Sequence, residues 1–117
     1  EIRVLIGMVE EDRTNLGDPQ MLARANRRFH HQIHLASHNR FLVQQLNLVH
    51  RSMALMAGTT LSAKGRDWVT LDEHQAIVDA ISQRDEAGAE QALRRHISMA
   101  YETRLKEEAR LNSEVDE

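Results

Sequence analysis

The 117-residue sequence contains no cysteine, one proline and only five glycines. Without cysteine the chain forms no disulfide, no thiolate metal site, no iron–sulfur cluster and no cysteine nucleophile. No apolar run approaches the roughly 18 residues of a membrane-spanning helix, and no signal-peptide pattern opens the sequence. We therefore expect a chain that works in the reducing cytoplasm and has no membrane partner.

An excess of positive charge is also lacking, because 15 Lys and Arg residues stand against 18 Asp and Glu residues, a formal net charge of −3. A nucleic-acid-binding surface normally shows a basic patch or stripe, so this balance argues against DNA contacts by the chain itself. The length suits a single domain. We expect that domain to span residues 1–111, followed by an acidic tail over residues 112–117.

Strand-forming runs of alternating β-branched or aromatic residues are absent as well, and apolar residues recur with the three-to-four spacing of helices. Five helices are predicted, over residues 2–11, 19–37, 40–57, 70–83 and 86–110. The predicted fold class is all-α, an antiparallel helical bundle. The third of these helices is apolar over a broad arc, which is typical of a central or interface helix.

Capping residues mark three of the predicted helix starts. Asp18 precedes Pro19, and proline suits the first helical position because its missing N–H has no intrahelical partner there. Asn39 and Asp85 stand where they can cap the third and fifth helices. These three positions fix the expected turns more sharply than the apolar spacing does.

The connection between the third and fourth helices is the longest one expected. Gly58 can close the third helix in the left-handed conformation, and residues 59–69 then link it to the fourth. The stretch Thr70-Leu71-Asp72-Glu73 has the form of a capping box, in which a Thr and an acid three residues later satisfy the first backbone amides. The fourth helix is therefore predicted to start at Thr70.

Seven histidines against only four aromatic residues are the main compositional excess. Three of them lie on the apolar faces of three different predicted helices: His30, His74 and His96. Asn26 precedes His30 by four residues, which places both on one face of the second helix. His31 faces solvent. His34 and His38 continue the ridge of Asn26 and His30 while drifting around the helix, and His50, late on the third helix, has no evident partner.

Two interpretations of the inward-facing histidines stay open. In the first, each is a half-buried imidazole whose nitrogens bond to a backbone carbonyl or a polar neighbour. In the second, they converge on one divalent cation, as side chains on facing helices do in many bundles. Imidazole nitrogens with one oxygen ligand suit Zn²⁺, Ni²⁺, Fe²⁺ or Mn²⁺. The pair His30 and His34, spaced by four residues, is a rival choice of ligands.

Several enzyme motifs are missing. There is no paired Glu-x-x-His set of a di-iron bundle and no His-Glu-x-x-His of a zinc protease. There is also no glycine-rich phosphate loop and no Gly-x-Ser-x-Gly elbow. We therefore do not expect an enzyme.

An ordered set of motifs runs along most of the chain. The motifs are Asn26-Arg27-Arg28-Phe29-His30, Ala36-Ser37-His38-Asn39-Arg40-Phe41-Leu42, Glu73-His74-Gln75-Ala76-Ile77-Val78-Asp79-Ala80-Ile81, Arg84-Asp85, Ala89 and Arg95-His96-Ile97. Together they resemble the FadR C-terminal domain (FCD) of GntR-type bacterial transcription regulators. The resemblance covers about Asn26 to Leu105, most of the chain.

The resemblance implies a helical bundle that binds a metabolite, often a small organic acid. It also implies a metal held by Asp or Asn, a His four residues later and two further histidines. Matched by position, these ligands are Asn26, His30, His74 and His96. Asn stands where Asp is more usual, so the site has one negative charge fewer and should hold its cation less tightly, although the amide still offers a carbonyl oxygen.

The function that the resemblance implies is effector sensing in a homodimer. The winged helix-turn-helix of the family, and its first bundle helices, are expected upstream of Glu1, so that this chain is an N-terminally truncated part. Open metal positions could take a carboxylate, and arginines could pair with its oxygens. The candidates are Arg27, Arg40, Arg94 and Arg95.

Two other classes of function remain open from the sequence. One is a metal-dependent hydrolase, which needs a carboxylate base near the metal; the nearest in sequence are Asp72, Glu73 and Asp79. The other is a metal-free helical dimerisation module that docks through the broad apolar arc of the third predicted helix.

Overall fold

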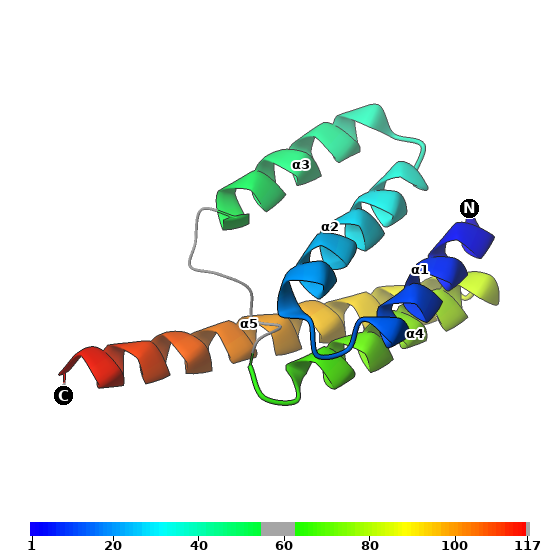
Figure 1. Cartoon of the computed structure of the whole chain (residues 1–117). Helices are drawn as coiled ribbons and strands as arrows, with labels where there is room; N and C mark the ends of the chain where they lie inside the picture. The colour runs from blue at the N-terminus through cyan, green and yellow to red at the C-terminus, as the bar shows by residue number, and fades with distance from the viewer. Residues whose placement is uncertain (55–62, 117) are drawn as a thin grey trace. The chain divides into compact units, whose positions relative to one another are not determined.

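The computed structural model describes residues 1–54 and 63–116, and within them it contains five helices and no strand (Figure 1). The helices are α1 (Ile2–Thr14), α2 (Pro19–Leu35), α3 (Arg40–Ala54), α4 (Arg66–Ser82) and α5 (Glu86–Asp116). The predicted all-α class is confirmed. None of these helices combines the length and the hydropathy that crossing a membrane requires. The chain divides into two compact units, Glu1–Thr59 and Thr60–Glu117.

In the first unit α2 contacts both α1 and α3. The predicted start of α2 is confirmed, because Asp18 caps the helix by accepting a hydrogen bond from the Met21 amide at 3.2 Å. The buried apolar side chains of this unit come from α1 and α2 at helical spacing: Leu5, Val9, Leu22 and Phe29. Burying a side chain of this size contributes about 1.5–3 kcal/mol.

The cap of α3 is also as predicted. Asn39 Oδ1 accepts hydrogen bonds from the amides of Phe41 and Leu42, both at 3.1 Å. α2 ends at Leu35, two residues earlier than predicted, and the turn that follows holds His38 at a φ of 54°. The predicted end of α3 at residue 57, and its closure by Gly58, lie outside the described residues.

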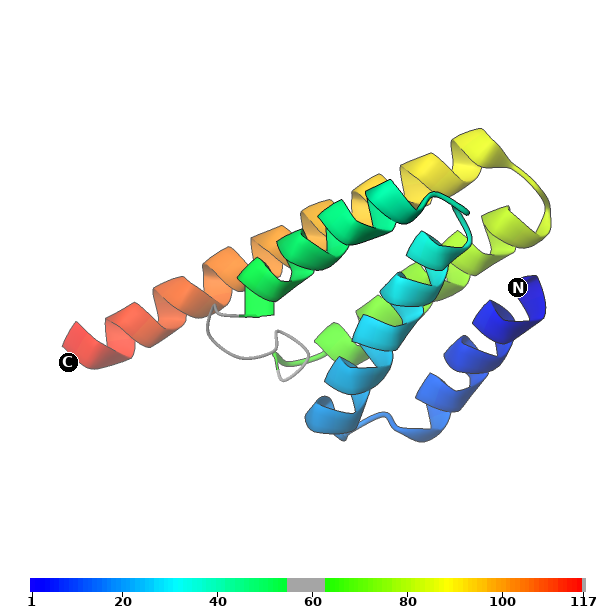
Figure 2. The same cartoon turned by 90° about the horizontal axis from the view of Figure 1, so that it is seen from above.

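The second unit is a hairpin of α4 and α5, in which α5 runs past the start of α4 (Figure 2). The prediction that α4 starts at Thr70 is wrong, because the helix begins at Arg66. Gly65 precedes it with a φ of 77°, a conformation open to glycine at little cost, and Asp67 lies in the first turn, where the helix dipole favours an acid. Glu73 therefore lies inside the helix.

The fifth helix starts as predicted, with Asp85 Oδ1 accepting from the Gly88 amide at 2.9 Å. It ends at Asp116, six residues beyond the predicted end, so most of the acidic tail is helical. Arg110 supports this extension by pairing with Glu107 at 3.1 Å and with Glu114 at 2.6 Å, at the three- and four-residue spacings that bring side chains together on a helix.

Candidate functional site

Two histidines occupy the interior of the second unit. His74 on α4 is 1% exposed and His96 on α5 is 5% exposed, so the predicted inward positions of both are confirmed. Their ring centroids lie 4.8 Å apart, and the ring planes meet at 72°. Two imidazoles at this separation bring nitrogen atoms from two helices to one place, which is the first requirement of a metal centre in a helical protein.

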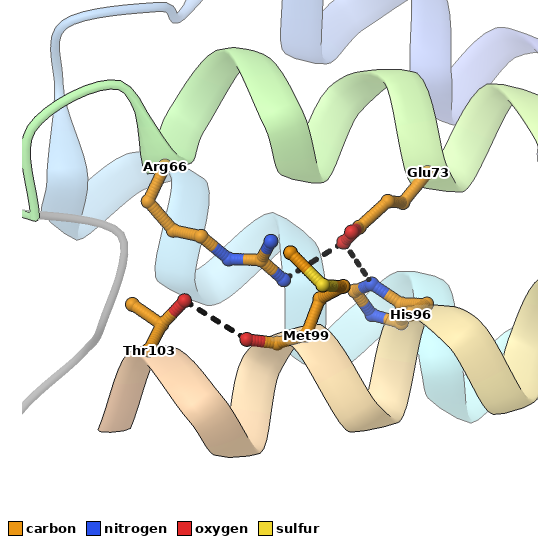
Figure 3. Close-up of polar contacts among 5 residues, drawn as sticks. All are labelled: Arg66, Glu73, His96, Met99 and Thr103. Carbon is orange, nitrogen blue, oxygen red and sulfur yellow. Dashed lines mark hydrogen bonds and ion pairs between the residues drawn. The ribbon is translucent and has the colours of Figure 1, made fainter. Parts of the chain in front are cut away.

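Glu73 orients His96 (Figure 3). The Glu73 Oε1 atom lies 2.8 Å from His96 Nδ1 and 2.8 Å from Arg66 Nη2. Because an ionised carboxylate only accepts hydrogen bonds, the neutral imidazole donates through Nδ1–H and carries its lone pair on Nε2. Carboxylates bonded in this way to the second nitrogen are common partners of metal-ligating histidines.

Burial lowers the pKa of His96, and the hydrogen bond that its ring donates to Glu73 only partly opposes that effect. The charge of Arg66 acts in the same direction as burial. His96 is therefore neutral at neutral pH, and the neutral ring is the form that ligates a metal ion.

Arg66 is a buried cation with donors to spare. It is 5% exposed, and one guanidinium nitrogen pairs with Glu73. Among the described residues, nothing accepts a hydrogen bond from its Nε or Nη1, both of which are buried. Thr70, one turn along α4, has a buried hydroxyl with no hydrogen-bond partner in the same part of the chain. Unmet buried donors of this kind cost about 1–3 kcal/mol each, which favours a bound acceptor.

Asn26 and His30 lie one turn apart on α2 in the first unit. The Asn26 Oδ1 atom is buried, and no described residue donates a hydrogen bond to it. An amide oxygen without a donor is suited to a cation. His30 is half-buried, with its ring edge-on to Phe29 at a centroid distance of 5.5 Å.

The other histidines lie elsewhere in the first unit. His31 is exposed, as predicted, and so is His38, which lies 2.9 Å from a Glu1 carboxylate oxygen. His34 and His50 are half-buried between α2 and α3, with ring centroids 5.1 Å apart. Burial is the largest cause of a lowered pKa at both.

The four arginines predicted to bind an effector are all exposed. Arg94 pairs with Glu90 on the same helix at 3.0 Å, and Arg40 lies over the Phe41 ring at 5.1 Å. Arg27 lies on α2 beside a pocket of the first unit, and Arg95 lies on α5. Arg66, which sequence reasoning assigned to a connection, is the buried arginine of the second unit.

The carboxylates considered for a hydrolase are placed as follows. Asp72 and Asp79 are exposed, and Asp79 accepts a hydrogen bond from Gln75 at 2.8 Å. Glu73 is enclosed but already accepts from Arg66 and His96. A carboxylate that already accepts from two donors has less of its lone-pair capacity left for a water molecule, so Glu73 is poorly placed to act as a general base.

Comparison with known proteins agrees with this architecture. The FCD domain family matches residues 1–99, which includes α1, a helix that the motifs quoted above do not reach. No curated protein and no solved structure is significantly similar to the chain. FCD domains are the effector-binding domains of GntR-type regulators and often hold a metal. The match spans most of the sequence, and the chain therefore belongs to the FCD domain family.

Proposed function

We propose that this domain senses a small organic acid with the help of a divalent metal, and that acid binding modulates DNA binding by a separate winged helix-turn-helix. The observation that carries the proposal is the buried pair His74 and His96, in which the hydrogen bond to Glu73 uses Nδ1 of His96 and so puts the ring's lone pair on Nε2, the atom proposed to ligate the metal. This arrangement is prepared for a cation before the cation arrives.

The proposed ligands are His74 and His96 with Asn26 and His30. The buried carbonyl oxygen of Asn26, without a donor among the described residues, supports its place in the set. Three imidazoles and one amide oxygen suit Zn²⁺, Ni²⁺, Fe²⁺ or Mn²⁺. When bound, the metal supplies a concentrated positive charge for a carboxylate oxygen of the effector.

Arg66 is the proposed partner of the effector's carboxylate. Nη2 gives one N–H to Glu73, and its second N–H shares an edge of the planar guanidinium with either Nε–H or Nη1–H, a geometry that matches two oxygen atoms of a carboxylate. The Thr70 hydroxyl offers a further donor one turn away. Arg27, Arg40, Arg94 and Arg95 are weaker candidates because each is exposed to water.

Signalling requires that the acid bind one arrangement of the domain more tightly than another. In this proposal the domain acts as a homodimer in the cytoplasm, and the favoured arrangement sets the spacing of two DNA-reading domains. A carboxylate bound at Arg66 would accept hydrogen bonds from its unpaired buried N–H groups. The resulting binding free energy favours the arrangement of the domain in which Arg66 is enclosed, because the same donors bond to water when Arg66 is exposed.

A thermal-shift panel of small mono-, di- and tricarboxylates, run with and without a chelator, tests the proposal. We expect at least one acid to raise the melting temperature of the metal-loaded domain, and the chelator to reduce that rise. A melting curve indifferent to every acid and to the chelator would leave a metal-free dimerisation module as the better account. Turnover of an ester by the metal-loaded domain would instead favour a hydrolase.

A further inference from the structure

The first unit contains a pocket formed by none of the proposed metal ligands. It lies between α2 and α3 and has a volume of about 240 Å³. α2 contributes three side chains at positions that share one helix face, and α3 contributes three more: Arg27, His31, His34, Asn47, His50 and Arg51. The pocket therefore belongs to a single helical hairpin.

The six side chains that line the pocket all carry nitrogen donors. They comprise two guanidiniums, three imidazoles and one side-chain amide, and no carboxylate lines the pocket. Among the described residues, neither Arg27 nor Arg51 forms an ion pair. Two arginine charges beside one small volume, with no acid in its lining, repel each other, and a bound anion would offset that repulsion.

The imidazoles show the same lack of a counter-charge. The Nδ1 atom of His34 is buried and has no hydrogen-bond partner among the described residues. Besides burial, the positive charges of neighbouring histidines lower the pKa of both His34 and His50. An anion in the pocket would accept hydrogen bonds from these rings, and its negative charge would raise the pKa values that the neighbouring histidine charges lower.

We propose that the α2–α3 pocket binds a phosphate group, either inorganic phosphate or the phosphate of a small monoester. A carboxylate offers two acceptor oxygens, whereas a phosphate monoester offers three and carries close to two negative charges at neutral pH. That charge offsets the charges of the two arginines, and the extra oxygen can accept from more of the six lining side chains than a carboxylate can. The volume accommodates such a group but no polymer.

Calorimetric titration of the metal-loaded domain with inorganic phosphate, at constant ionic strength and in excess chloride, tests the inference. We expect saturable binding of one phosphate per chain, with NMR shifts of the His34 and His50 ring signals. Arg51→Gln should weaken binding about tenfold or more, because it removes a charge-assisted hydrogen bond. Arg28→Gln, which removes the same charge from an α2 position outside the pocket, should leave the affinity within about twofold.

Further arms of the experiment separate this site from the proposed metal centre. Phosphate bound through the metal would be lost in His74→Ala or after chelation, whereas phosphate bound in the pocket should persist in both. Glycerol 3-phosphate in place of inorganic phosphate identifies the source, since tighter binding of the ester points to a phosphorylated metabolite and tighter binding of the free ion to phosphate itself.

The inference is overturned by any of three results. One is the absence of heat and of ring shifts up to about 10 mM phosphate, a range that covers even millimolar affinity. Another is an equal loss of affinity in Arg28→Gln and Arg51→Gln. The third is succinate that shifts the His34 and His50 rings at concentrations where phosphate does not. None of these results bears on the response of the second unit to a chelator.

Discussion

Asp12 in the first unit and Glu73 in the second are both enclosed carboxylates, and they are held in opposite ways. Glu73 accepts hydrogen bonds from Arg66 and His96 at 2.8 Å each. Asp12, 6% exposed, forms no ion pair with a described residue, and burial raises its pKa to about 6, helped by the charge of Glu11 and opposed by that of Arg28.

The difference shows what a buried acid does in each setting. A carboxylate with two donors organises its neighbours, and here it fixes the tautomer of a histidine and holds a guanidinium. A carboxylate with no close cation takes up a proton more readily instead. The α2–α3 pocket completes the contrast, because its arginines and histidines have no acid at all.

Removal of the Glu73 carboxylate should have the largest effect. Glu73→Ala leaves Arg66 as an uncompensated buried charge, and such losses destabilise a protein by about 3–5 kcal/mol. His96 also loses the partner that orients it, so metal affinity should fall about 10–100-fold. Urea unfolding measures the first effect and metal titration of the folded domain measures the second.

Glu73→Gln is the matched variant that keeps an acceptor for His96 while removing the charge. It should retain more metal affinity than Glu73→Ala. Equal metal binding by Glu73→Ala and the wild-type domain would show that Glu73 has no positioning role.

Asp12→Asn should stabilise the domain at neutral pH. Because the folded pKa of about 6 lies above the ordinary aspartate value of 3.8, ionised Asp12 opposes folding. This penalty on the free energy of unfolding grows as pH rises through that interval and is complete above it. We expect Asp12→Asn to gain about 1–3 kcal/mol at pH 7.5 and almost nothing at about pH 3 and below, where the folded and the unfolded wild type are both largely protonated.

Unfolding free energies at several pH values check this expectation. Glu10→Gln, at an exposed position of the same helix, is the control and should change the pH dependence little. A gain for Asp12→Asn that is the same at pH 4 and pH 7.5 would contradict the account.

Arg66→Lys separates effector binding from metal binding. Lysine keeps a positive charge near Glu73 but replaces the planar fork with one ammonium group, so it cannot match a carboxylate at two points. The acid that stabilises the wild type should bind about tenfold more weakly, while the response to a chelator stays.

Arg95→Lys, an exposed change on α5, is the control for that experiment. Thermal shifts measured over a range of acid concentrations give the acid affinity of Arg66→Lys and of Arg95→Lys. A loss in Arg95→Lys with none in Arg66→Lys would return the effector site to the arginines expected from the sequence alone.

The sequence predicted the helices well wherever a local signal governs them. Asp18, Asn39 and Asp85 cap the helices as expected, because a cap depends on a few neighbouring backbone amides. The burial of His74 and His96 was predictable from the apolar residues that share their helix faces.

Arg66 was not recognised as a site residue, and Glu73 was considered only as a hydrolase base, for a physical reason. Thr70 and Glu73 form a valid capping-box pattern, but the left-handed Gly65 starts α4 one turn earlier. That extra turn places Arg66 on the same helix face as Glu73. The spacing of apolar residues cannot predict a contact between two charged side chains seven residues apart. The residues that line the α2–α3 pocket were not predicted either, because the pocket depends on how α2 and α3 pack against each other.

Thermal unfolding of the wild-type domain and of His96→Ala, each with and without a chelator, tests the central claim most directly. Metal at about a hundred times its dissociation constant adds about 2.7 kcal/mol when it binds only the folded state. We predict that the chelator lowers the melting temperature of the wild type and of the surface variant His38→Ala but not that of His96→Ala. A chelator that leaves the wild-type curve unchanged, or lowers the His96→Ala curve by the same amount, would contradict the proposed metal centre.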